Sequence, residues 1–170
     1  EFAYAVVNWE HWELHLNCKT EKERRFLTGG VGQHLLGSQE FFTKEQKYTL
    51  DPLRRGHSSL VCSAVPGIRR VRLTALTMQF GGPFGRTREE RADDLLLALE
   101  HDGESIPEAA ELLKAKFEFE FADSSKPRPV TLARGNRATY TRSGDSALVE
   151  RFFELQKFSR RVGHAAMALA

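Results

Sequence analysis

The sequence predicts an α+β fold whose mostly antiparallel sheet is built from β-hairpins and has helices packed on one face. The first observation is Lys116–Phe121, where three phenylalanines alternate with charged residues. A spacing of two gives a strand one buried face and one solvated face. The second is Asp123–Pro129, a run of turn formers, after which Val130–Ala133 resumes a strand-like composition. Together they predict a hairpin at the centre of the fold.

Helix start signals are the third observation. Thr20 and Glu23 have the spacing of a capping box, and the helix that they open is expected to stop at Gly29-Gly30. Asp145 is expected to cap the clearest helix. Its apolar stripe comprises Leu148, Val149, Phe152, Phe153 and Leu155, with Glu150 facing water.

Alternation and apolar runs predict the remaining strands. They are expected at Tyr4–Val7, His11–Cys18, Lys47–Leu50, Ser59–Val65, Val71–Phe80, Arg86–Arg91 and, after Val130–Ala133, Ala138–Thr141. Asp93 or Asp94 is expected to cap a helix, and Ser105 with Glu108 to open another that ends near Leu113. The order of these elements suggests two β-β-α units that share one sheet.

Size and composition predict one α+β domain over residues 1–158 and a loose tail over residues 159–170. No stretch approaches the roughly 20 apolar residues of a membrane helix, so no membrane partner is expected. The two cysteines are too few for a disulfide scaffold or a cysteine-based zinc site. They fit a reducing compartment, and a cytoplasmic location is expected.

Charge is distributed unevenly. Residues 91–123 carry 3 basic and 10 acidic residues, whereas residues 124–170 carry 9 basic and 3 acidic residues. This asymmetry is typical of a protein with an anionic partner, although the two segments could also neutralise each other in the fold.

The segment Arg134-Gly135-Asn136-Arg137 predicts a hairpin whose two-residue loop is Gly135-Asn136. Such a hairpin would place Arg134 opposite Arg137. Facing like charges lower stability, so their presence points to an anionic partner. The predicted contact residues for nucleic acid or an acidic protein surface are Arg134, Arg137, Lys126, Arg128, Arg142, Arg69, Arg70 and Arg72. The alternative is a solvated loop, or pairing of the arginines with Glu118 and Glu120.

Three other motifs are incomplete. The segment from Gly29 to Ser38 has the glycine spacing of a phosphate-binding loop but lacks its lysine. Gly56-His57-Ser58-Ser59-Leu60 lacks the second glycine of a nucleophile elbow. No metal site is predicted. The weak candidates His11, Glu13 and His15 share one strand face, but His11 and His15 are about 13 Å apart along the strand, too far to share an ion easily.

The leading hypothesis is a non-catalytic binding or regulatory module without a cofactor, part of a larger intracellular assembly, whose basic hairpin contacts a protein partner or nucleic acid. The alternative is an enzyme whose site is assembled from scattered residues, with His11, Glu13, His15 or His57 as its members.

Overall fold

The computed structural model describes residues 3–9, 13–18, 20–42, 47–134 and 137–159. The chain divides into two compact units, one within residues 1–45 and one within Gln46–Val162. They are called unit 1 and unit 2 and are described separately. The single domain over residues 1–158 stays a prediction. Most of the tail predicted over residues 159–170 lies outside the described residues, and its first residue, Ser159, is buried and bridged to Tyr48.

Unit 1 contains the antiparallel strands β1 (Tyr4–Asn8) and β2 (Glu13–Asn17) and the helix α1 (Glu21–Leu36). The predicted capping box is confirmed, because the Thr20 hydroxyl accepts from the Glu23 amide and the Glu23 carboxylate accepts from the Thr20 amide. The prediction that this helix stops at Gly29-Gly30 is wrong. It continues to Leu36 and is capped by Gly37, whose φ of 73° is the left-handed conformation that ends a helix.

Unit 2 is built on one antiparallel sheet, which in the described residues has the strand order β4-β3-β5-β6-β7. Its strands are β3 (Ile68–Phe80), β4 (Thr87–Arg91), β5 (Ala110–Phe121), β6 (Arg128–Ala133) and β7 (Arg137–Tyr140). The predicted α+β class and the central hairpin of β5 and β6 are confirmed. Alternate residues of β5 are buried, as the phenylalanine spacing predicted.

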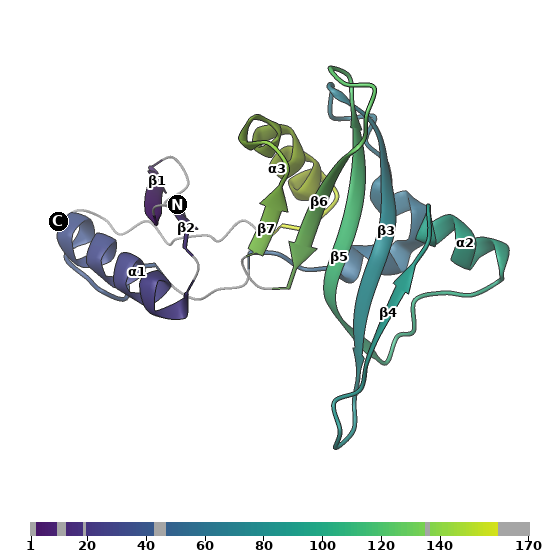
Figure 1. The fold of residues 1–170 in the computed structure, drawn as a ribbon, viewed down its shortest axis with the longest axis horizontal. Coiled ribbons are helices and arrows are strands. Elements are labelled where there is room, and N and C mark those ends of the chain that lie inside the picture. Colours follow the sequence, from purple (N-terminus) through teal and green to yellow (C-terminus); the bar gives the residue numbers. More distant parts are fainter. Residues whose placement is uncertain (1–2, 10–12, 19, 43–46, 135–136, 160–170) are drawn as a thin grey trace. The chain divides into compact units, whose positions relative to one another are not determined.

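Helices cover one face of this sheet. Figure 1 shows η1 (Asp51–Leu60), α2 (Leu95–His101) and α3 (Ser146–Leu155) on the same side of the strands. The short turn η2 (Ser143–Asp145) precedes α3. Phe119 meets Phe152 edge-to-face at 5.3 Å, so β5 and α3 share the core. The opposite face, called the open face below, carries the polar residues of the same strands.

Two predicted elements are wrong. Residues 59–65 are not a strand, because η1 extends to Leu60 and turns follow it. The predicted helix from Ser105 to Leu113 does not form, because β5 begins at Ala110 and pairs there with Phe80 of β3. Of the short strand expected at Lys47–Leu50, the structure has the single bridge between Tyr48 and Ser159.

Candidate functional site

Most of the arginines predicted to contact a partner are held within the protein itself. Five of the eight predicted residues form ion pairs, which join Arg70 to Asp94, Arg72 to Glu118 and Glu120, Arg128 to Asp123 and Asp145, Arg134 to Glu111, and Arg142 to Asp123. Arg69 donates to the carbonyl of Ala122 at 2.9 Å. Within the described residues, Lys126 and Arg137 alone of the eight have no side-chain partner.

Arg128 shows how completely such a side chain is engaged. Its guanidinium lies 2.7 Å from Asp145 and 3.1 Å from Asp123, and it stacks over the Phe121 ring at 5.0 Å. Hydrogen bonding and attraction from Arg128 lower the pKa of Asp123. Asp145 makes no side-chain hydrogen bond to the start of α3, since its carboxylate faces this arginine. Arg128 therefore fastens β6 to the start of α3.

The register of β6 and β7 corrects the predicted hairpin. Arg137 lies opposite Ala133, and the Arg134 amide donates to the carbonyl of Leu113. Arg134 and Arg137 are therefore not directly opposed, and the destabilising pair that supported an anionic partner does not exist. Residues 135–136 lie outside the described residues.

The open face instead carries excess positive charge toward one end of the sheet. Among the described residues, the half of this face nearest the start of β5 holds five cations and two carboxylates, here called the cationic half: Arg91, Lys114, Lys116 and Arg137 on the strands and Arg134 in the turn after β6, with Glu89 and Glu111. In the other half, Arg70 and Arg72 are balanced by Glu118 and Glu120.

The strand register brings these charges together. Thr77 of β3 is opposite Lys114, which is opposite Ala133 of β6, which in turn is opposite Arg137. These residues form one row across four strands. Lys116 follows on the same face of β5, about 6.8 Å from Lys114 along the strand.

Two carboxylates neutralise only part of this charge. Glu111 pairs with Arg134, and Glu89 lies 3.0 Å from Arg91. A hydrogen bond from Arg91, with weaker attraction from Arg91, Lys114 and Lys116, lowers the pKa of Glu89. Within the described part of the chain, neither lysine forms an ion pair. Their ammonium groups are exposed on a face that no element of unit 2 covers.

Sequence reasoning missed Lys114 and Lys116. The alternation in β5 placed Lys116 on the solvated face, and this was the one feature of the sequence that could have identified it as a contact residue. Its cationic neighbours come from β4 and β7, and only the register shows which of them share a row.

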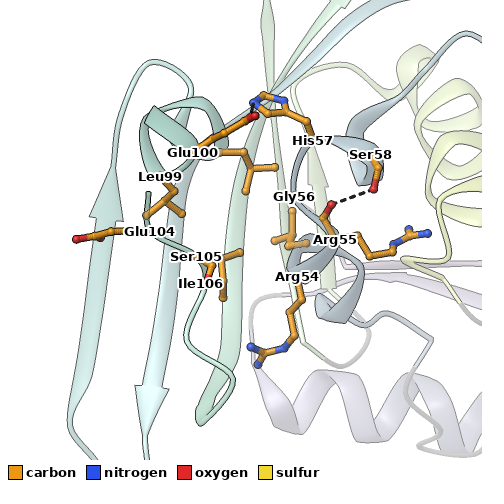
Figure 2. Close-up of a pocket in the computed structure, with 12 residues that line it drawn as sticks. Arg54, Arg55, Gly56, His57, Ser58, Leu99, Glu100, Glu104, Ser105 and Ile106 are labelled. Carbon is orange, nitrogen blue, oxygen red and sulfur yellow. Dashed lines mark hydrogen bonds and ion pairs between the residues drawn. The ribbon is translucent and has the colours of Figure 1, made fainter. Parts of the chain in front are cut away.

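A groove lies on the opposite side of the sheet, between η1 and α2 (Figure 2). Its volume is about 360 Å³. Its apolar lining comes from the buried residues Leu53, Leu96 and Ile106 and the partly buried Leu99. Arg54 also lines it, but the guanidinium donates to the carbonyls of Pro107 and Ala110.

Two residues meet at the mouth of this groove. His57 lies 3.8 Å from Glu100, and both side chains are well exposed. Ser58 donates to the carbonyl of Arg55 and Ser59 to that of Gly56, so neither hydroxyl is bonded to His57. The segment is part of a 3-10 helix and not a strand-to-helix turn, which excludes the nucleophile elbow. The enzyme alternative stays a prediction.

A third cluster links three segments of unit 2. Tyr48 and Tyr140 both donate to Glu150, and Lys47 lies 3.2 Å from the same carboxylate. Glu150 was expected to face water, but its side chain is only 23% exposed. The cluster fastens Lys47 and Tyr48 to β7 and α3.

The remaining sequence motifs form no site in the structure. The glycine cluster from Gly29 to Leu36 is helical, so its amides are bonded within α1 and cannot surround a phosphate. Among the described residues, no three His, Cys, Asp or Glu side chains converge as metal ligands. His11 lies outside the described residues, as does the side chain of Glu13, and His15 is exposed.

In the described ranges, no helix has both the length and the apolar character needed to cross a lipid bilayer. No protein-family model matches the chain, and neither do curated proteins or solved structures.

Proposed function

We propose that the protein is a non-catalytic binding module whose cationic half binds the phosphates of duplex nucleic acid. One observation carries this proposal: Lys114 and Lys116 are exposed, and Arg137 shares the row of Lys114, on a sheet face that no described element of unit 2 covers and that has more cations than carboxylates among the described residues of this half. Such a cluster attracts a polyanion and gains affinity from the counterions that the polyanion releases.

The chemistry of the surrounding residues favours phosphate. Thr77, Thr131 and Thr139 lie among the cations on the open face. Threonine hydroxyls, like lysine and arginine side chains, donate hydrogen bonds to phosphate oxygens. This surface therefore offers both charge and neutral donors to the oxygens of a phosphate backbone.

Within the described strands, the open face carries no exposed aromatic ring, which favours a duplex over a single strand. The aromatic residues described in the five strands belong to the core or pack against it: Phe80, Phe117, Phe119, Phe121 and Tyr140. Proteins that bind single strands stack successive bases on several exposed aromatic rings, and the described strands offer none on the open face. We therefore expect binding that is independent of sequence and sensitive to salt.

A cytoplasmic location and membership of a larger intracellular assembly complete the proposal. Cys18 and Cys62 are both free thiols in the structure, and a reducing compartment keeps thiols in this state. Unit 1 leaves large apolar side chains exposed, such as Phe26 at 77%, and another component of the assembly would cover them.

The test is fluorescence anisotropy of a labelled duplex with the full chain, titrated at several salt concentrations. The variant replaces Lys114, Lys116 and Arg137 by glutamine. We expect weaker binding and a log–log salt slope that is smaller by about 2.7, because each lost phosphate contact removes about 0.9.

The matched control replaces Lys22, Arg151 and Lys157 by glutamine. These residues are exposed and lie outside the cationic half, so the change in net charge is the same. Equal losses in the two triple variants would contradict the proposal, since net charge alone would then explain binding. Binding to polyglutamate but not to the duplex would replace nucleic acid by an acidic protein partner.

A further inference from the structure

The hairpin between β3 and β4 holds a phenylalanine almost entirely in solvent. Phe84 is 93% exposed. The tip around it is an ordered turn: the Phe80 amide donates to the carbonyl of Arg86 at 2.8 Å, and Gly82 and Gly85 have φ values of 116° and 54°. Residues with a side chain rarely adopt these conformations, so the two glycines shape the turn on which Phe84 is displayed.

This tip lies at the same end of the sheet as the cationic half. Gln79, near the end of β3, is opposite Thr87 of β4 and Glu111 of β5. Thr77, the partner of Lys114, is three residues before Phe80, or about 10 Å along the strand. Figure 1 shows the hairpin projecting beyond the ends of the neighbouring strands. A duplex bound to the cationic half can therefore extend to the tip.

A cation in the same turn indicates what Phe84 would meet. Arg86, two residues after Phe84, has its guanidinium 5.3 Å from the centre of the Phe80 ring and forms no ion pair within the described residues. A turn that carries both an exposed apolar side chain and a cation suits a partner with apolar groups behind an anionic surface. In duplex nucleic acid, stacked base pairs lie behind the phosphates.

We propose that Phe84 is a wedge that inserts between base pairs of the duplex bound by the cationic half. The proposal rests on the function proposed above and adds the base step as a second contact. Inserted apolar side chains unstack neighbouring base pairs and bend the helix. The phosphate contacts hold the duplex, and Phe84 deforms it.

The experiment uses the full chain and a duplex that carries an aminopurine base analogue, whose fluorescence rises when its neighbours unstack. Binding of the natural chain is expected to raise this fluorescence. Phe84→Ala is expected to abolish the rise and to weaken binding about tenfold, as loss of a base–aromatic contact does. Its salt slope should be unchanged, because the phosphate contacts remain. The control, Leu97→Ala, removes a 53% exposed apolar residue from α2 and should behave like the natural chain.

The outcomes separate the two proposals. Duplex binding that depends on Lys114 and Lys116 but shows no fluorescence rise would overturn the wedge and leave the proposed function intact. No duplex binding by the natural chain would overturn both. Vesicles of anionic phospholipid provide a further arm: binding to them that is lost in Phe84→Ala, without duplex unstacking, would make the tip a membrane contact and overturn the wedge.

Discussion

The hydroxyl groups of Tyr48 and Tyr140 donate to the same carboxylate oxygen of Glu150. Tyr48 is 5% exposed, so water cannot readily replace this acceptor. A buried donor that loses its partner costs about 1–3 kcal/mol. We therefore expect Glu150→Ala to lower the free energy of unfolding by about that amount, as measured by urea denaturation.

Glu150→Gln is the control for this prediction. Glutamine keeps an oxygen that accepts from both tyrosines and loses only the charge that pairs with Lys47. The expected loss is below about 1 kcal/mol, because the ion pair is partly exposed. A glutamine variant as unstable as the alanine variant would show that the hydrogen bonds are not the source of stability.

Stability should also fall at alkaline pH. Burial, and next the charge of Glu150, raise the pKa of Tyr48. The folded protein therefore keeps the phenol neutral at a pH where the unfolded chain ionises it, above about pH 10. The stabilisation is fully present below that pH and decreases above it, by up to about 1.4 kcal/mol per pH unit.

The measurement is the free energy of unfolding of the natural chain and of Tyr48→Phe between about pH 8 and about pH 11. Phenylalanine has no hydroxyl to ionise, so its curve should decline less steeply above about pH 10. Parallel curves for the two proteins would contradict the raised pKa.

Truncation of two phenylalanines should affect stability to very different extents. Phe119 is fully buried and contacts Phe152, so Phe119→Ala should lower the free energy of unfolding by about 3–5 kcal/mol. Phe84→Ala should change it by less than about 0.5 kcal/mol, because the ring is 93% exposed. Thermal denaturation compares the two variants. A destabilised Phe84→Ala would show that the ring packs against the protein.

Two glycines of α1 should also respond in opposite directions. A Cβ at Gly29 would meet no atom within 4 Å, so Gly29→Ala should stabilise the helix by about 0.5–1 kcal/mol. A Cβ at Gly32 would collide with the carbonyl oxygen of Ser38, so Gly32→Ala should destabilise it. Circular dichroism during thermal unfolding measures both effects. Equal gains would contradict the close approach at Gly32.

Identical sequence signals led to different structures. Thr20 and Glu23 form a capping box, whereas Ser105 and Glu108 have the same spacing and form none. In the second case, pairing with β3 draws the chain into β5 from Ala110, and Arg54 binds carbonyls of that segment. Contacts with residues distant in sequence therefore override a local preference.

The sequence by itself determined the elements whose pattern is local. The alternating phenylalanines of β5 specify a buried face, because successive strand side chains point to opposite sides. The buried Phe152 and Phe153 of α3 follow from helical spacing in the same way.

Tertiary structure alone decided which charges remain available. Arg72 is neutralised by Glu118 of another strand, whereas Lys114 lies beside Thr77 and keeps its charge exposed. Strand register determines these pairings, and it depends on the packing of the whole core. For this reason the proposed contact surface keeps Arg134 and Arg137 of the predicted set and adds Arg91, Lys114 and Lys116 from neighbouring strands.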